Sequence, residues 1–320
     1  MPSKRGVLGL ILAFLALCAP VARAQVFWAN FNNAAGSALG SAALDGTGTN
    51  AAFIPGASGP CGVATDGTEV FWANWASSTI GRANADGSGA NQAFIAASTA
   101  GCGVAITSQY VFWANTGFGA GTTIGRANRD GSGADNNFIT GAHGPCGVAV
   151  DGTYVYWANN ATGTIGRARL DGTDVDDAFI PGAGSFLCGV AVDAGHVYWA
   201  NAFGGSTIGR ASIDGTGADA NFISGLGSPC GVAVDSNYVY WASSGTGPIG
   251  RALLDGSAAN TAFIPTGGAP CGVAVFRKAL PSAPAAVPAL SPGVLALLGL
   301  LSALLGWAAL RRRHTSKKCL

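Results

Sequence analysis

Six cysteines that recur at regular intervals are the residues of this sequence best suited to chemistry. Each is followed by Gly-Val-Ala, and successive cysteines are 41, 44, 42, 42 and 41 residues apart. They are Cys61, Cys102, Cys146, Cys188, Cys230 and Cys271. Thiols at equivalent positions can form disulfides, hold a soft metal ion, or pack as small apolar residues. No histidine accompanies them at a fixed spacing, which argues against a zinc site.

Four carboxylates form a second cluster within one short segment. They are Asp171, Asp174, Asp176 and Asp177. Oxygen ligands at close spacing suit calcium. Their spacing does not match an EF-hand loop, however, and aspartate near a tight turn commonly bonds its own backbone. We therefore expect no cofactor, with calcium at these four residues as the alternative.

Aromatic residues that do not repeat form a third group of candidates. They are Phe31, Trp75, Phe118 and Phe203, and each follows a Trp-Ala-Asn segment. We expect all four on loops at one face of the fold. Exposed aromatic rings on a rigid scaffold suit stacking on sugars or gripping a peptide. The alternative interpretation is that they fill gaps between structural units.

Five arginines recur at one repeat position: Arg82, Arg126, Arg167, Arg210 and Arg251. A single active site needs one residue in one place, so repetition favours a structural role. We expect these arginines to pair with carboxylates such as Asp151, Asp193 and Asp235.

Charge and missing motifs exclude several classes of function. Between residues 25 and 275, seven arginines face 16 carboxylates, which gives a net charge of −9. An acidic body without a basic stripe argues against nucleic acid as a partner. The sequence also lacks a serine nucleophile motif, a phosphate loop and paired glutamates.

The repeat that carries these residues is clearest between Cys146 and Ile180. Val155, Tyr156 and Trp157 suit a strand that is covered on both faces. Residues 164–170 form a second strand, Asp171-Gly172 a tight hairpin turn, and residues 178–180 a returning strand. With the next cysteine segment, each unit supplies about four strands. A period of about 40 to 45 residues with several short strands predicts a β-propeller.

The two ends of the array indicate how the ring closes. The array begins with Val-Phe-Trp-Ala-Asn at residues 26–30 and ends with Cys-Gly-Val-Ala-Val at residues 271–275. Each end supplies what the other lacks. We therefore predict that these segments pair in one shared blade, which closes a six-bladed ring without a free sheet edge.

This architecture would place the six cysteines on the innermost strands, in a ring around one mouth of the central channel. A disulfide needs two Cα atoms within about 7 Å. We expect neighbouring inner strands to be separated by roughly the channel radius, which opposes disulfides. Buried packing, disulfides and a metal site remain open at this point.

The repeat resembles a known family. Tyr-Trp-Ala-Asn at 156–159, Ile-Gly-Arg at 165–167, Leu-Asp-Gly at 170–172 and Gly-Val-Ala-Val-Asp at 189–193 are similar to the YWTD repeat of low-density-lipoprotein-receptor-type six-bladed propellers. The resemblance covers roughly residues 26–275 and implies the same fold. Ala-Asn replaces Thr-Asp in most copies, so the ligand-binding role of that family does not transfer directly.

The chain termini predict export. Residues 1–24 combine Lys4 and Arg5, an apolar core and Ala-Arg-Ala, which is typical of a secretory signal peptide. A proline-rich linker at 277–292 precedes an uncharged segment at 293–310, long enough for one transmembrane helix, and a basic cytoplasmic tail at 311–320. The region from Val287 onward resembles the IPTL-CTERM and PEP-CTERM bacterial sorting signals. That resemblance implies a membrane-bound processing protease as a partner and a location at the cell envelope or surface.

These observations predict an all-β protein with a propeller at residues 25–276. Our leading functional hypothesis is a non-catalytic binding module for an extracellular peptide, glycan or surface protein. The alternative is a channel-centred, metal-dependent enzyme that resembles lactonases or lyases. Such an enzyme requires at least three converging carboxylates at a channel mouth.

Overall fold

The structure is a computed structural model that describes residues 25–31, 37–96, 101–116, 119–202, 205–245 and 247–277. Several predictions concern segments outside these residues: the signal peptide, the linker beyond Arg277, the transmembrane helix, the basic tail, and the aromatic residues Phe118 and Phe203. No helix in the described part of the chain is long and apolar enough to cross a membrane.

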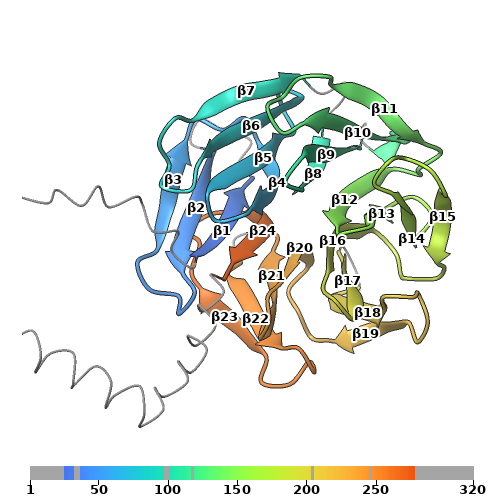
Figure 1. Ribbon diagram of the computed structural model, residues 1–320. Helices are drawn as coiled ribbons and strands as arrows, with labels where there is room; N and C mark the ends of the chain where they lie inside the picture. Colours follow the sequence, from blue (N-terminus) through green and yellow to red (C-terminus); the bar gives the residue numbers. More distant parts are fainter. Residues whose placement is uncertain are drawn as a thin grey trace, which may run out of the picture. The chain divides into compact units, whose positions relative to one another are not determined.

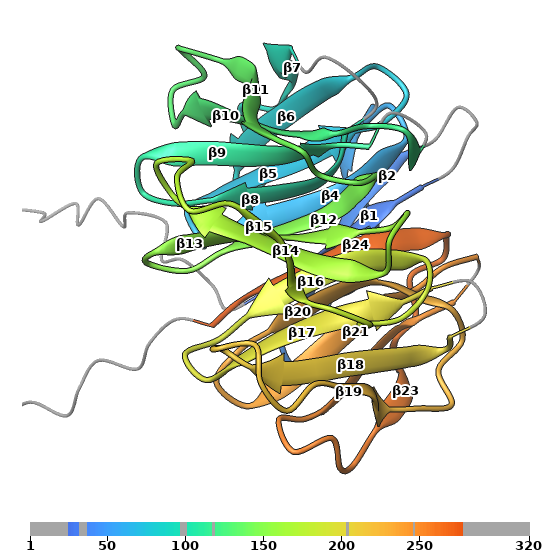
Figure 2. The ribbon, with the colours of Figure 1, turned by 90° about the vertical axis from the view of Figure 1, so that its right-hand side faces the viewer.

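The described residues form six antiparallel sheets of four strands each, arranged around a central axis (Figure 1) and seen from the side in Figure 2. This arrangement confirms the predicted six-bladed β-propeller with four strands per blade. We number the blades along the chain, and blade 1 contains β1.

The strands occupy four equivalent positions in the blades. The inner strands are β4 (Pro60–Thr65), β8 (Gly101–Ile106), β12 (Pro145–Val150), β16 (Leu187–Val192), β20 (Pro229–Val234) and β24 (Pro270–Phe276). The second strands are β1 (Gln25–Asn30), β5 (Glu69–Asn74), β9 (Tyr110–Asn115), β13 (Tyr154–Asn159), β17 (His196–Asn201) and β21 (Tyr238–Ser243). The third strands are β2 (Ala38–Ala43), β6 (Thr79–Asn84), β10 (Thr123–Asn128), β14 (Thr164–Arg169), β18 (Thr207–Ser212) and β22 (Ile249–Leu253). The outer strands are β3 (Asn50–Pro55), β7 (Asn91–Ala96), β11 (Asp135–Thr140), β15 (Asp176–Ile180), β19 (Asp219–Ile223) and β23 (Asn260–Ile264).

Blade 1 closes the ring with strands from both ends of the array. Its order is β24-β1-β2-β3, and Val26 of β1 lies opposite Val275 of β24 in the antiparallel register. The predicted shared blade is therefore confirmed. Without this pairing, β24 would have no partner strand and β1 would offer a free sheet edge to other chains.

The second and third strands of each blade fit together through a tryptophan and a glycine. In blade 4, Trp157 lies opposite Gly166, and any side chain at Gly166 would overlap the indole ring. The same pair recurs in the other five blades. All six tryptophans are fully buried. The Trp-Ala-Asn and Ile-Gly-Arg motifs are thus two halves of one packing unit, because the glycine allows the indole to lie across the neighbouring strand.

Apolar clusters between adjacent blades form the core. One such cluster joins Tyr156 of blade 4 to Val190 and Trp199 of blade 5, and five similar clusters complete the ring. Because both faces of every blade are covered in this way, the second strands are apolar on both sides, as the sequence predicted.

The repeated arginines also contribute to the contacts between blades. Arg126, Arg210 and Arg251 each donate a hydrogen bond to a leucine carbonyl oxygen of the next blade, at 3.1, 2.9 and 3.0 Å. Each guanidinium also lies over a phenylalanine ring, for example Arg126 over Phe138 at 3.7 Å. The structural role predicted for these arginines is confirmed.

Arg82 pairs with a carboxylate, that of Glu69, but the three partners named from the sequence were wrong. Asp151, Asp193 and Asp235 instead accept hydrogen bonds from the hydroxyls of Tyr156, Tyr198 and Tyr240, at 2.9, 3.1 and 3.1 Å. They also accept backbone amides in their own turns, for example the amide of Tyr154 on Asp151 at 2.7 Å. The sequence showed the charges but not the competing donors, which lie closer along the chain.

Candidate functional site: the cysteine face

The inner strands approach one another closely because glycine follows every repeat cysteine. A Cβ atom built on Gly147 would lie 2.5 Å from the carbonyl oxygen of Cys188 and 2.7 Å from the amide nitrogen of Val190. The equivalent glycine of every other blade meets the backbone of its neighbour in the same way. Any larger residue would push the inner strands apart, so these glycines set the diameter of the channel at this end.

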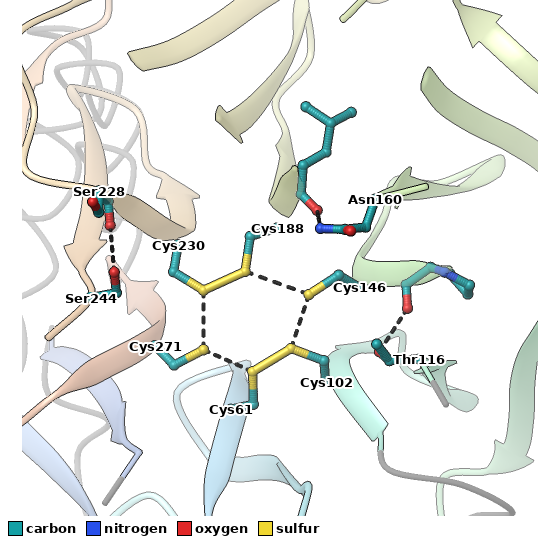
Figure 3. Close-up of a disulfide and its surroundings, with 12 residues drawn as sticks. Cys61, Cys102, Thr116, Cys146, Asn160, Cys188, Ser228, Cys230, Ser244 and Cys271 are labelled. Atoms are coloured by element: carbon teal, nitrogen blue, oxygen red, sulfur yellow. Dashed lines mark hydrogen bonds between the residues drawn. A yellow bond between two sulfur atoms is a disulfide. The ribbon is translucent and has the colours of Figure 1, made fainter. Parts of the chain in front are cut away.

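This close approach brings the six repeat cysteines into a single ring of sulfur atoms (Figure 3). Disulfides join Cys61 to Cys102 and Cys188 to Cys230, with Cα atoms 5.1 Å apart in both pairs. The expectation that neighbouring inner strands would be too far apart for disulfides was therefore wrong. It took the strand separation from the channel radius and did not consider the glycine after each cysteine, which lets the strands approach.

The remaining two cysteines, Cys146 and Cys271, are free thiols. Cys146 is buried and Cys271 is half-buried. Burial raises the pKa of the Cys146 thiol to about 12, and it raises the pKa of Cys271 as well. Both thiols are therefore protonated at neutral pH. Since the thiolate is the reactive form, neither resembles the activated cysteine of an enzyme.

One residue of each blade follows the second strand and lies on the face that carries the cysteines. We call this surface, made of the six cysteines and these six residues, the cysteine face. The six residues are Phe31, Trp75, Thr116, Asn160, Ala202 and Ser244. Thr116 donates a hydrogen bond to the Pro145 carbonyl oxygen at 2.7 Å, and Asn160 donates one to that of Leu187 at 3.1 Å (Figure 3). Both bonds hold the segment that leads into the next cysteine.

Phe31 and Trp75 depart from this pattern in blades 1 and 2. Their ring centroids are 5.6 Å apart and nearly perpendicular, at 72°. Both side chains are partly buried and pack against the cysteine cluster. Two of the four predicted loop aromatics therefore lie together on the cysteine face. The other two, Phe118 and Phe203, are outside the described residues.

Phe186 is a surface aromatic residue that the sequence analysis missed. It lies two residues before Cys188, is 52% exposed, and has a φ angle of 53°. The equivalent positions before Cys61 and Cys146 are Gly59 and Gly144, which also have positive φ angles. A phenylalanine in this left-handed conformation costs about 1 to 2 kcal/mol relative to an ordinary one. The signal for it was present in the sequence, because a bulky residue occupies a column in which the other repeats have glycine, alanine or serine.

The side chains that line the channel beyond the sulfur ring are almost all apolar. The channel contains a cavity of about 190 Å³ lined by the second to fourth residues after the cysteines, such as Val190, Ala191 and Val192. The lining side chains are valine, alanine, isoleucine and a single threonine, Thr65. The lining residues thus provide none of the converging carboxylates that the lactonase-like hypothesis requires.

The four carboxylates considered for calcium are not brought together. Asp171 accepts a hydrogen bond from the Thr173 hydroxyl, Asp174 from Arg169, Asp176 from the Ala178 amide, and Asp177 from the Trp157 indole. In the described part of the chain, three or more potential metal ligands lie within 4.8 Å of one another only among the ring cysteines.

Comparisons with known proteins support the fold. A scan against models of protein families found no match, and a search of curated proteins found no significant match. Among solved structures, one from a nidogen/laminin complex is similar with a TM-score of 0.68 and 19% identity, covering 80% of this chain and 99% of that chain. A virginiamycin B lyase from Staphylococcus aureus has a TM-score of 0.48 and 16% identity, covering 65% of this chain and 72% of the lyase chain. The first similarity supports the propeller fold alone, and the second is too low to support any argument.

Proposed function

We propose that this chain is an exported, non-catalytic binding module that grips a segment of a partner protein on its cysteine face. The observation that carries the proposal is the aromatic pair Phe31 and Trp75. It interrupts a ring of positions that elsewhere hold small or polar residues. A structural need would recur in every blade, whereas a ligand contacts some blades and not others.

The geometry of the pair suits a contact with a partner. A hydrogen bond fixes the backbone of each aromatic residue. The Phe31 amide donates to the Ala269 carbonyl oxygen at 2.7 Å, and the Trp75 amide donates to the Gly59 carbonyl oxygen at 3.1 Å. Both side chains remain partly exposed. Rigid aromatic side chains lose little conformational entropy on binding and are common hot spots of interfaces.

Phe186 provides a second anchor on the same face. It precedes blade 5, which lies across the ring from blade 2, the blade that carries Trp75. Its exposure and its left-handed backbone are both unfavourable for an isolated chain. A partner that covers Phe186 would offset the first of these costs. An extended segment that crosses the face could contact both sites.

A protein as the partner is consistent with the similar structure from the nidogen/laminin complex, which contains two proteins. We also propose that the chain is exported by residues 1–24 and held at the cell envelope by residues 293–310 until a sorting protease processes the tail. Only the sequence patterns described above support this second part of the proposal.

A peptide-display selection on the purified protein tests the proposed function. We expect the selected peptides to bind the unaltered protein, and Trp75→Ala or Phe31→Ala to weaken binding at least tenfold, as expected for hot-spot residues. Val175→Ala is the matched control, since Val175 is 46% exposed but lies in the hairpin turn at the opposite face. Peptides that bind both aromatic variants as tightly as the control would refute the proposed surface. If no peptide binds and an oligosaccharide array does, the partner class would be a glycan.

A further inference from the structure

The two disulfides of the sulfur ring pair only four of its six cysteines. Each cysteine has two neighbours in the ring. The sulfur distances between pairs that are not bonded are 2.8 Å for Cys61 and Cys271, 3.1 Å for Cys102 and Cys146, 3.5 Å for Cys146 and Cys188, and 3.1 Å for Cys230 and Cys271 (Figure 3). Every sulfur is therefore in contact with both of its neighbours.

A ring of six sulfurs can be completely paired between neighbours in only two ways. The first pairing joins Cys61 to Cys102, Cys146 to Cys188, and Cys230 to Cys271. The second joins Cys102 to Cys146, Cys188 to Cys230, and Cys271 to Cys61. The two disulfides of the structure belong to different pairings, since Cys61–Cys102 is from the first and Cys188–Cys230 from the second. This mixture leaves Cys146 and Cys271 on opposite sides of the ring, where they cannot bond to each other.

We propose that the ring is an oxidation site, at which exchange between neighbouring sulfurs moves a free thiol around the ring and an external disulfide then completes a third disulfide. This proposal does not rest on the binding function proposed above, although both sites lie on the cysteine face. Its substrate is a small disulfide such as oxidised glutathione, or an exposed disulfide of a thiol oxidoreductase.

The exchange step is balanced without any other reactant. Cys146 is protonated at neutral pH, so the exchange is slow and proceeds through its minor thiolate form. This thiolate attacks the sulfur of Cys188, so that the Cys146–Cys188 bond forms and the Cys188–Cys230 bond breaks. The proton lost by Cys146 is taken up by the released Cys230. This step changes neither the number of disulfides nor the number of thiols, and it places the free thiol of Cys230 beside that of Cys271.

The oxidation step then uses the external disulfide. The minor thiolate form of Cys271 attacks it, forms a mixed disulfide and releases one external thiol. Cys230 attacks the Cys271 sulfur, forms the third ring disulfide and releases the second external thiol. The two ring thiols lose two electrons, and the external disulfide gains them. Cys271 is the point of access, because it is the half-buried member of the ring while the other five are buried.

A metal site in the same ring is less favourable on physical grounds. Three overlapping groups of three sulfurs lie close enough to hold a soft ion. However, metal ligation requires thiolates. The other residues of the cluster, Ala202, Phe31 and Trp75, carry no charge that could compensate them. The burial that raises the pKa of Cys146 and Cys271 penalises such a charged cluster in the same way. A disulfide ring is neutral and avoids this cost.

Trypsin provides a direct test, because an arginine separates every pair of successive ring cysteines. The full-length protein, isolated without reductant, is incubated with oxidised glutathione, its thiols are alkylated under denaturing conditions, and the non-reduced digest is mapped by mass spectrometry. We expect the alkylated fraction of all six ring cysteines to fall close to zero. We also expect every linked pair of peptides to join neighbours in the ring.

Two variants make the test more specific. Cys271→Ser leaves five cysteines in a row, so pairing between neighbours must leave one thiol at Cys61, Cys146 or Cys230, and never at Cys102 or Cys188. The double variant with Cys146→Ser and Cys271→Ser has no thiol to start the exchange. In that control we expect only the Cys61–Cys102 and Cys188–Cys230 pairs, before and after oxidation.

Three results would overturn the proposal. The first is a protein in which Cys146 and Cys271 stay alkylatable, or in which Cys271 keeps a glutathione adduct, after prolonged oxidation. The second is a set of linked peptides from cysteines that are not ring neighbours, or an unpaired Cys102 or Cys188 in the Cys271→Ser variant. The third is six free ring thiols with bound metal in the isolated protein, which would identify a thiolate metal site instead.

Discussion

Replacing Gly147 by alanine should destabilise the propeller, although alanine normally favours a strand over glycine. The added Cβ atom would lie 2.5 Å from the Cys188 carbonyl oxygen, 2.7 Å from the Val190 amide nitrogen and 2.8 Å from the Cα atom of Gly189. All three atoms belong to the backbone of the next inner strand. No rotation of a side chain can relieve the overlap, so β12 and β16 must move apart.

The magnitude follows from two opposing effects. Overpacking of a filled interior costs about 1 to 3 kcal/mol. Removing a glycine from a strand stabilises by roughly 0.5 to 1 kcal/mol, because the unfolded chain loses conformational freedom. The net effect lies between about 0 and 2.5 kcal/mol, and we expect a loss of about 1 kcal/mol, which is a decrease in melting temperature of roughly 2 to 4 °C for a propeller of this size.

Gly152→Ala is the matched control. Gly152 lies five residues further along the same blade, has no atom within 4 Å of its Cβ position, and does not have a left-handed backbone. The free energy of unfolding of the Gly152→Ala variant should be unchanged or slightly higher than that of the unaltered protein. Both variants are compared with the unaltered protein by urea unfolding in the presence of reductant, so that disulfides do not contribute. If Gly147→Ala were as stable as Gly152→Ala, the inner strands would not be held at the distance that forms the sulfur ring, and the argument would fail.

Two further predictions concern Phe186 and Tyr240. Phe186→Gly should raise the free energy of unfolding by about 1 kcal/mol, because glycine adopts a φ angle of 53° without strain. The same substitution should weaken partner binding. A loss of stability in urea unfolding would contradict the first expectation. Burial, together with the Asp235 carboxylate, raises the pKa of Tyr240 to about 12, so above pH 10 the unfolded chain binds fewer protons than the folded one and stability falls as pH rises. Tyr240→Phe introduces the residue that blades 1 to 3 have at this position. Between pH 10 and 12, the stability of this variant should fall less steeply with pH, by at most about 1.4 kcal/mol per pH unit, because solvent screening can only reduce the effect of the tyrosine. Equal slopes for the variant and the unaltered protein would refute the assignment.

The sequence was sufficient to predict the fold because the determinants of the fold repeat. The interval between cysteines, the Asp-Gly turns and the complementary ends of the array define six blades and their closure, and these are confirmed. The partners of the arginines could not be predicted in the same way. Whether Asp151 bonds an arginine or Tyr156 depends on distances of a few ångströms between neighbouring strands, which spacing along the chain does not determine.

The contact between the cysteines could have been predicted from a sequence feature that the analysis did not use. Glycine follows each cysteine without exception. In a strand, glycine often marks a place where another backbone approaches closely. Applied to all six repeats, that rule predicts a constriction of the channel at the cysteines and hence contact between the sulfurs. The aromatic Phe186 could have been found similarly, by asking which repeat has a bulky residue in a column that otherwise holds glycine, alanine or serine.

The number of blades and the chemistry of the ring are linked by parity. If each blade supplies one cysteine and sulfurs pair only with their neighbours, a ring with an odd number of blades must always retain a free thiol. Six blades allow complete pairing, in two equivalent ways that differ in every bond. One of them includes Cys61–Cys271, which joins β24 of blade 1, the last strand of the array, to β4 of blade 2. Exchange around the ring would therefore decide whether β24 is held to the N-terminal strands by its pairing with β1 alone or also by a covalent bond to β4.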